Sequence, residues 1–355
     1  MFELLGNINV DWMGKRKIFI SVSIFILLAG LFSAIGRNWV KDGSAFNLGV
    51  DFKGGTVVVA KFKQKPATDE IRNSLQQVGI MESVIQDSTD KTDEVLIKVP
   101  NLGERKDVCP DVTGEAGRCF IQKALAIFGK ESVGATPLNQ DAEAAFKIVG
   151  TEAVGPVAGA QLRNQAVIAT LLGLVGILLF IAFRYDWTYA AGAVIAVFHD
   201  VLVTLAFFTI FQWEINLTVI AALLTLVGFS VNDSIVIFDR IRENLTLNRN
   251  KTLYELTNQS INQTMSRTIV TNGLVFLAVL ALVIFGGEVL RGFSLALFVG
   301  SITGTYSTIA IASPIAIWWQ DKLGAAKIKM AEVSKGKDSL ASASRRSVRR
   351  KSVVR

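Results

Sequence analysis

Ionisable residues lie within apolar runs that are long enough to cross a lipid bilayer. Asp233 lies in VGFSVNDSIVIFDRIREN, the neighbours His199 and Asp200 lie in AVFHDVLV, and Arg267 lies in SINQTMSRTIVTNG at the start of a further run. A charge is costly in hydrocarbon, so an ionisable residue at such a position indicates a functional site with a polar partner. The chemistry open to these residues is the binding and transfer of a proton or another cation.

Asp233 and Arg267 belong to consecutive apolar runs and lie near the same membrane surface. The two runs are antiparallel if both cross the membrane, so the two side chains are expected to face each other. A carboxylate beside an arginine stays ionised, whereas one that loses its partner in a low dielectric takes up a proton. A movable Arg267 would make Asp233 a proton-binding switch. The alternatives are a static salt bridge, an Asp233 that reaches the surface, and an Arg267 that anchors the inner membrane face.

His199 is the single histidine of the chain. Its unperturbed pKa of about 6.5 suits a proton relay. The alternative is an interhelical hydrogen bond, worth about 1 kcal/mol or less. Asp200 either orients His199 or accepts a hydrogen bond from a neighbouring helix.

Long membrane helices must position these residues. The chain has 355 residues, of which 51% are hydrophobic and cluster in runs, and about 20 apolar residues in a helix span the hydrocarbon core. Six spans are predicted, at residues 18–35, 166–183, 188–211, 217–238, 268–285 and 293–319. Basic residues before the first span suggest a signal peptide, but its length and the lack of a cleavage site favour an uncleaved anchor.

Basic residues also select the cytoplasmic side of a membrane. They precede the first span, fill the loop at residues 240–251 and dominate the tail, so both termini are predicted to be cytoplasmic. The predicted organisation is a cytoplasmic N-terminus (1–17), a first span (18–35), an outer domain (36–165), spans two to six (166–319) and a basic cytoplasmic tail (320–355).

The formal net charge of +7 resides mostly in this tail and does not indicate nucleic-acid binding. The tail is rich in serine and has no apolar face, which favours a disordered flank held inside by its charge. Contact with anionic lipid headgroups or a ribosome is the alternative, because basic clusters beside a membrane are attracted to anionic lipid.

The outer domain shows alternating strand and helix patterns. Its strands are rich in β-branched residues and bounded by turn residues, and its first helix carries acidic residues in the first turn. The predicted elements are a strand at 55–62, a helix at 68–79, strands at 81–88 and 93–100, a helix at about 118–130 and a strand at 146–156. The order β-α-β-β-α-β is typical of the ferredoxin-like arrangement.

Cys109 and Cys119 are the two cysteines of the chain, and both lie in a polar loop of the outer domain. An oxidising exterior permits a disulfide between them. Free thiols are the alternative, and a metal site is not expected because other ligands are not nearby.

The sequence lacks the phosphate-binding pattern GxxxxGK[ST], the zinc pattern HExxH and a nucleophile elbow. The chain is therefore not expected to be an enzyme, to hydrolyse ATP or to hold a cofactor. An ion gradient fits an acid inside the membrane, since one charge crossing 100 mV gains about 2.3 kcal/mol. A carboxylate serves either H⁺ or Na⁺, and the sequence does not separate them.

Several long stretches carry a resemblance to a known family. They are NLGVDFKGGT (47–56), VGPVAGAQLRNQA (154–166), FHDVLVTL, INLTVIAALLTLVGFSVNDSIVIFDRIREN (215–244), SINQTMSRTIVT (260–271) and FGGEVLRGFSLALFVGSITGTYS (285–307). Over nearly its whole length the chain resembles the SecD/SecF family of protein-export membrane subunits, and the SecF branch more than the SecD branch, which has a larger outer region. The Cys109–Cys119 loop departs from the compact family pattern.

The resemblance implies half of an RND-superfamily transporter in a bacterial inner membrane, with six helices and a periplasmic ferredoxin-like domain. It implies partnership with SecD, the SecYEG channel and YajC, and proton-driven assistance to a translocating unfolded polypeptide after SecA has used ATP. It further implies that Asp233 and Arg267 take part in proton passage. Asp51, with Gly54 and Gly55, would couple the outer domain to the membrane part, although these three could form only a turn before a strand.

Two other functions stay open beside protein export. A small-molecule efflux component of the RND type would carry two six-helix halves and large outer pockets in one chain, whereas this chain has one half and one small domain. A structural scaffold would tolerate loss of the Asp233 charge while the complex still assembles.

Overall fold

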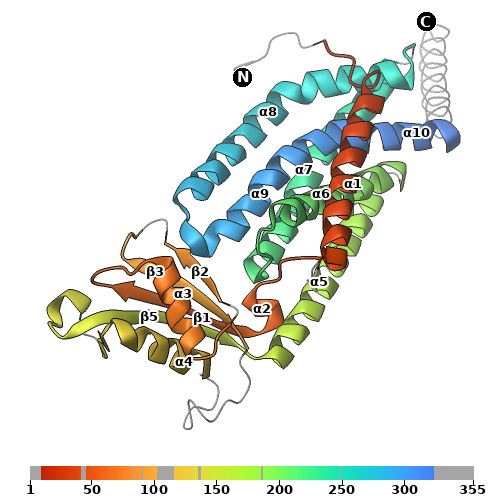
Figure 1. The fold of residues 1–355 in the computed structure, drawn as a ribbon. Coiled ribbons are helices and arrows are strands. Elements are labelled where there is room, and N and C mark those ends of the chain that lie inside the picture. Colours follow the sequence, from red (N-terminus) through yellow and green to blue (C-terminus); the bar gives the residue numbers. More distant parts are fainter. Residues whose placement is uncertain are drawn as a thin grey trace, which may run out of the picture.

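The computed structural model describes residues 9–40, 45–81, 83–88, 91–101, 116–134, 137–184, 187–248 and 250–323. An α+β domain lies at one end of a bundle of long helices (Figure 1). The chain passes through the bundle once in α1 (Arg16–Val40) before it forms the domain. It returns through α5 (Pro156–Arg184) and then stays in the bundle.

The six predicted spans are confirmed as six helical segments with the length and apolar composition of membrane helices. Two of them, α7 and α8, extend well beyond the predicted spans toward the end of the bundle far from the domain. The sixth is interrupted by a π-helical turn, Thr308–Ala312. The segments after α5 are α6 (Trp187–Phe211), α7 (Leu217–Leu247), α8 (Leu253–Phe285), α9 (Gly287–Ser307) and α10 (Ser313–Leu323).

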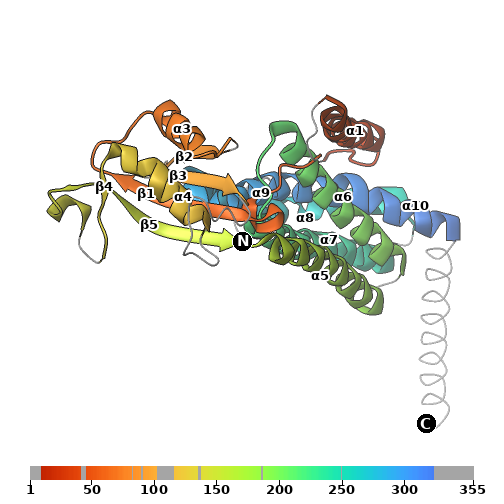
Figure 2. The ribbon, with the colours of Figure 1, turned by 60° about the horizontal axis from the view of Figure 1, so that its bottom comes forward.

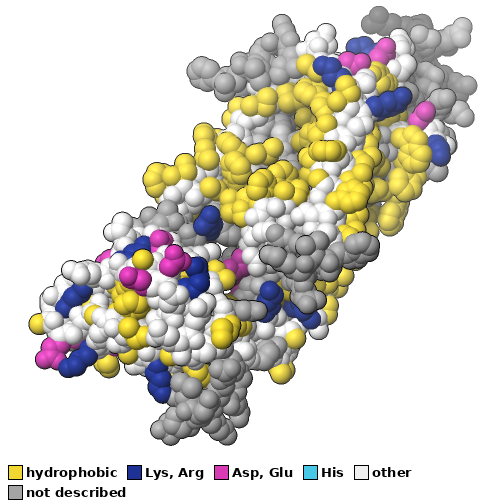
Figure 3. Space-filling view, viewed as in Figure 1, with side chains coloured by type: hydrophobic (Ala, Val, Ile, Leu, Met, Phe, Trp, Pro, Cys, Tyr) yellow, Lys and Arg dark blue, Asp and Glu magenta, His cyan; other side chains and the backbone are white. Residues whose placement is uncertain are grey.

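The helices differ in how much of their surface other helices cover. At least half of the most apolar window is buried in α6, in α7 and in α9 with α10, whereas less than a fifth of that window is buried in α1, α5 and α8. Hydrophobic side chains cover most of the bundle surface in view, while charged side chains gather on the α+β domain and at the far end of the bundle (Figure 3). Outward apolar helices around a packed interior are what a lipid environment requires, so the chain is a multi-pass membrane protein.

The α+β domain confirms the predicted ferredoxin-like order. Its sheet has the strand order β2-β3-β1-β5-β4, with β1, β2, β3 and β5 antiparallel and the short β4 parallel to β5. The elements are α2 (Val50–Lys53), β1 (Gly55–Phe62), α3 (Thr68–Gln77), β2 (Val84–Asp87), β3 (Glu94–Pro100), α4 (Ala116–Leu125), β4 (Lys130–Glu131) and β5 (Ala144–Val154). The elements α2 and β4 were not predicted.

The second helix of the domain is shorter than the predicted 118–130. The helix α4 ends at Leu125, and a 3₁₀ turn (Ala126–Phe128) leads to Gly129. Gly129 has a φ of +132°, which ends the helical turn, and the chain then pairs with β5 as β4.

The helices α3 and α4 lie against the sheet and bury the domain core (Figures 1 and 2). Strand β1 alternates buried and half-buried residues, which is the period expected of a strand with one covered face. Its inward residues Val58, Ala60 and Phe62 pack with Leu75 of α3 and Phe120 of α4. The packed sheet places β1 and β3 next to the membrane bundle (Figure 1).

The segment before α1 is fastened to the first turns of α8. The Asp11 carboxylate accepts hydrogen bonds from the Tyr254 hydroxyl (2.7 Å), the Gly14 backbone N–H (2.9 Å) and the Asn258 amide (2.6 Å). The Tyr254 hydroxyl, which has the largest effect, and the other two donors hold the pKa of Asp11 below its usual range, because they stabilise the ionised form. The contact ties the start of α1 to α8 at the end of the bundle far from the domain.

Candidate functional site

Asp233 lies midway along α7 and is buried, with 5% of its surface exposed. Its Oδ2 accepts a hydrogen bond from the side-chain amide of Asn272 on α8. The same amide nitrogen donates to the Thr305 hydroxyl on α9 at 2.6 Å. Three helices therefore meet at this carboxylate through one amide group.

The direct contact expected from Arg267 is made by Asn272 instead. Arg267 is exposed, and the described residues include no ion pair between it and Asp233, although its charge is close enough to act on the carboxylate. Arg267 does not reach Asp233 directly because it points to a different side of α8 from Asn272. Arg267 precedes Asn272 by five residues, which places the two about 140° apart around α8, and Asn272 faces α7. The role of Asp233 and Arg267 in ion coupling stays a prediction.

Asp200 on α6 is fully buried and forms a second polar cluster. Its Oδ2 accepts hydrogen bonds from the hydroxyls of Ser230 on α7 (2.6 Å) and Ser307 on α9 (2.7 Å). Its Oδ1 lies 3.1 Å from His199 Nδ1. Asp200 thus both orients His199 and accepts bonds from neighbouring helices, the two arrangements that the sequence left open.

His199 is buried beside Asp200. Its Nε2 has no hydrogen-bond partner among the described residues, and its ring lies 6.4 Å from that of Tyr306. The Tyr306 hydroxyl itself bonds to Ser23 and to the Phe19 carbonyl of α1. A proton-relay role for His199 and Asp200 stays a prediction.

The two carboxylate clusters share α7 and α9. Ser230 and Asp233 lie one helical turn apart on α7, and Thr305 and Ser307 are two residues apart on α9. The π-helical turn follows Ser307 directly, and such turns occur often at functional sites because they widen a helix locally. We call the following residues the polar layer: Asp200, Ser230, Asp233, Ser234, Asn272, Thr305, Ser307 and Thr308.

Sequence reasoning missed the uncharged members of the polar layer. A signal exists on α7, where Ser230, Asp233 and Ser234 follow the spacing of one helix face. A similar signal exists on α8, where Thr268 and Asn272 are four residues apart and both buried. Such polar stripes in an apolar helix mark the side that faces other helices.

The α+β domain joins the bundle at the connection between α6 and α7. The Asp51 carboxylate accepts a hydrogen bond of 2.8 Å from the backbone N–H of Leu217, the first residue of α7. Beside it, Gly49 N–H donates to the Ile215 carbonyl and Ile215 N–H donates to the Asn47 carbonyl, both at 2.8 Å. Asp51 therefore acts as a cap on α7 that is supplied by the domain.

Gly54 and Gly55 form the turn that leads from Asp51 into β1. Their φ angles of +77° and +153° are conformations that favour glycine. A Cβ at Gly55 would also lie 2.4 Å from the Val99 carbonyl oxygen of β3. A side chain at position 55 would therefore clash with the β3 backbone, so glycine is required there. The turn that the two glycines form holds Asp51 against α7.

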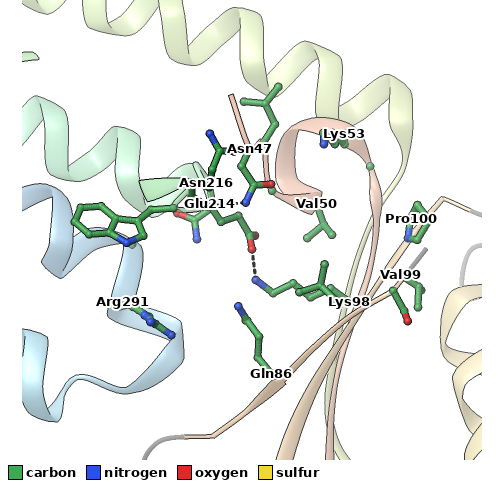
Figure 4. A pocket seen from close by; sticks show the side chains of 18 of the residues that line it. Asn47, Val50, Lys53, Gln86, Lys98, Val99, Pro100, Glu214, Asn216 and Arg291 are labelled. Carbon is green, nitrogen blue, oxygen red and sulfur yellow. Dashed lines mark hydrogen bonds and ion pairs between the residues drawn. The ribbon is translucent and has the colours of Figure 1, made fainter. Parts of the chain in front are cut away.

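A charged contact and a cavity lie beside this junction. Lys98 of β3 forms an ion pair with Glu214, just before α7, and both side chains are largely buried. Figure 4 shows the pair with the side chains around it. The cavity has a volume of about 620 Å³ and opens between the sheet, the α6–α7 connection and the start of α9. Its labelled lining residues include Asn47, Val50, Lys53, Gln86, Pro100, Asn216 and Arg291.

Replacing Asp51 by alanine is expected to loosen the junction. Loss of a helix-capping acceptor costs about 0.5–2 kcal/mol, and the domain would lose its bond to α7. We expect a lower midpoint of thermal unfolding in detergent and faster proteolysis near residues 45–55. Asp51→Asn keeps an acceptor oxygen and is the matched control, expected to behave much more like the original protein. Equal behaviour of the alanine and original proteins would contradict a capping role.

Cys109 lies outside the described residues, so its predicted bond to Cys119 stays a prediction. The placement of Cys119 in a polar loop was wrong, because Cys119 lies on α4 and packs against the domain core. Within the described ranges, no group of three or more histidine, cysteine or acidic side chains is arranged to hold a metal ion.

Known proteins are similar to this chain over most of its length. The family described as protein export membrane protein SecD/SecF, C-terminal, matches residues 135–322, and the SecD/SecF GG motif matches residues 44–66. The protein translocase subunit SecF of Koribacter versatilis is 39% identical over 387 residues, covering 91% of this chain and 94% of that relative. The chain belongs to the SecF family. Membership confirms the predicted accessory role in Sec protein export.

A fused relative covers SecF and a further region. The protein translocase subunit SecDF of Thermus thermophilus is 37% identical over 309 residues, covering 86% of this chain but 38% of that relative. The crystal structure of SecDF from Thermus thermophilus, described as a translocon-associated membrane protein, matches with a TM-score of 0.70 at 33% identity. This match covers 89% of this chain and 39% of that one. The predicted architecture of the SecF family is thereby confirmed for this chain.

Proposed function

We propose that this SecF-family chain pairs with a SecD partner and uses the proton motive force to promote late, ATP-independent steps of protein export. The observation that carries the proposal is Asp233, a carboxylate buried midway along a membrane helix and held by one amide. The same helix begins at the bond between Leu217 and Asp51 of the α+β domain. A change at Asp233 can therefore reach the domain along α7 and through this hydrogen bond.

The proposed cycle has three steps. A proton from outside neutralises Asp233, which removes its attraction to Arg267 and weakens the hydrogen bond that it accepts from Asn272. The helix α7 then shifts against α8 and α9, because a ligand biases two states according to its different affinity for them. The shift reaches the domain through Asp51 and through the Lys98–Glu214 pair. The domain holds and releases an emerging unfolded polypeptide, which biases its movement outward.

The proposed setting is a bacterial inner membrane, with the α+β domain in the periplasm and both termini in the cytoplasm. The partners are SecD, the SecYEG channel, YajC and the translocating polypeptide, with lipid around the RND-type bundle. The fused SecDF relative supports SecD as the partner. The chain acts without catalysing a reaction, and its energy source is an ion gradient, H⁺ first and Na⁺ as the second candidate.

The test compares vesicles with and without this chain. Inverted inner-membrane vesicles containing SecD, SecYEG and YajC would export a reporter preprotein, and the increment due to the chain would be measured. We expect a protonophore to abolish that increment and a Na⁺ ionophore to leave it. The opposite pattern would assign Na⁺ coupling, and an increment insensitive to both ionophores would replace ion coupling by a scaffold role.

A further inference from the structure

Asn272 donates a hydrogen bond to Asp233 and is itself 5% exposed. Its amide nitrogen donates both hydrogens, one to Asp233 Oδ2 and one to Thr305 Oγ1. Its own Oδ1 is buried and has no hydrogen-bond partner in the part of the chain that the structure describes. Buried polar atoms are normally paired, because an unpaired one has lost its bonds to water without replacement. Asn272 therefore supplies a hydrogen-bond donor to an ionised Asp233, while its own oxygen accepts no hydrogen bond from the described residues.

The hydrogen-bonding needs of Asp233 reverse when it is protonated. An ionised carboxylate only accepts hydrogen bonds, whereas a protonated carboxyl has one O–H donor that needs an acceptor. An asparagine amide has donors at one end and an acceptor at the other. Half a turn about the Cβ–Cγ bond of Asn272 would bring Oδ1 to the Asp233 O–H and carry Nδ2 to the place of the unpaired oxygen.

A cavity beside Asn272 gives the amide room to turn. The cavity has a volume of about 390 Å³ and lies between α1, α8 and α9. Asn272 and Thr305 line it together with Phe19, Phe276 and Tyr306. A side chain packed tightly on all sides would have to displace its neighbours for its amide to turn, whereas Asn272 lines a cavity.

The reversal would reach α9 through Thr305. Its hydroxyl now accepts from Asn272 and donates to the Ser301 carbonyl of its own helix at 2.9 Å. With Oδ1 turned toward it, the hydroxyl would donate to Asn272 and release Ser301. Thr305 lies two residues before Ser307, which bonds Asp200, and three before the π-helical turn.

We propose that Asn272 is a positioning residue whose amide reverses when Asp233 takes up a proton, and that this reversal transmits the protonation state from α7 to Thr305 on α9. The inference rests on the proposed function, since it requires Asp233 to titrate.

Several other titratable or charged groups lie on α8 or on the helices packed against α7. Arg267 on α8 acts on it through its charge. Asp200 and His199 on α6 bond to each other, and Asp200 also bonds to serines of α7 and α9. Tyr306 on α9 bonds toward α1. None of these groups donates a hydrogen bond to Asp233 within the described residues. Asn272 is therefore the group whose hydrogen bond must change when Asp233 is protonated.

The test is infrared difference spectroscopy of the chain with its SecD partner in lipid nanodiscs, between high and low pH. The carboxyl C=O band of protonated Asp233 is identified by its loss in Asp233→Asn. We expect a second difference band that moves on ¹⁵N labelling of asparagine and that is also absent from Asp233→Asn. This readout uses the unaltered protein and does not depend on a variant at position 272.

Two variants separate transmission from packing. Leucine has nearly the same shape as asparagine. In Asn272→Leu the carboxyl band of Asp233 is expected at higher frequency, because the O–H of Asp233 has lost its acceptor. Thr305→Val is the matched variant on α9. It should keep both bands but lose most of the gradient-dependent export.

The outcomes also separate this inference from the proposed function. A carboxyl band that titrates without any asparagine signal, and that keeps its frequency in Asn272→Leu, would overturn the amide reversal and leave the proposed function standing. The absence of any Asp233 band at all pH values would overturn both.

Discussion

Exchanging Asp233 for asparagine is expected to leave the chain folded and bound to its SecD partner while removing the gradient-dependent part of protein export. Asparagine has the shape of aspartate and keeps an oxygen that can accept the bond from Asn272. It cannot bind and release a proton, however. A charge that crosses 100 mV gains about 2.3 kcal/mol, and the variant would forfeit that gain in each cycle. The measurement is reporter export in vesicles with and without a proton gradient.

Asp239→Asn is the matched control for this experiment. It makes the same chemical change on the same helix, but Asp239 is exposed whereas Asp233 is buried. We expect the control to export like the original protein. If Asp233→Asn still responds fully to the gradient, Asp233 is a packing residue, and the coupling must lie with His199 and Asp200 or with the partner subunit.

Replacing Asp200 by leucine is expected to destabilise the helix bundle more than the substitutions at Asp51 or Asp233. Asp200 is fully buried and accepts bonds from Ser230 and Ser307 while contacting His199. Its removal leaves these groups on three helices without their acceptor, at about 1–3 kcal/mol for each buried group that finds no other partner. We expect a clearly lower midpoint of thermal unfolding and a lower yield of the complex in detergent.

Asp200→Asn serves as the graded control, because it keeps one acceptor oxygen but presents N–H donors to a serine or to His199. Its loss of stability should be smaller than that of the leucine variant. Asp239→Leu, on the exposed side of α7, should have little effect. An Asp200→Leu protein that unfolds at the original temperature would show that the cluster does not hold α6, α7 and α9 together.

The architecture followed from the sequence because its causes are local. A membrane span needs about 20 apolar residues regardless of its neighbours, so the six helices could be located by composition. The α+β domain likewise shows its order through strand and helix periodicity. The errors lie where a local signal was weak, as after Leu125, where α4 gives way to a 3₁₀ turn, Gly129 ends that turn and β4 pairs with β5.

The position of each candidate site residue in sequence was also evident, since a charge in an apolar run stands out. Asp233, Asp200 and His199 were found in this way, and all three are buried. Asp51 was singled out by resemblance, and its bond to Leu217 joins residues 166 positions apart in the chain. No local pattern indicates such a partner.

The partners of these residues were decided only by the tertiary structure. Which residue of α8 meets Asp233 depends on the rotation of α8 about its own axis, and packing against α9 sets that rotation so that Asn272 rather than Arg267 faces the carboxylate. The same packing brings Ser230 and Ser307 to Asp200. Composition and periodicity determine that a helix forms and crosses the membrane, because those depend on the helix and its solvent. The contacts between helices depend on the shapes of several faces at once, and the sequence of one helix does not contain them.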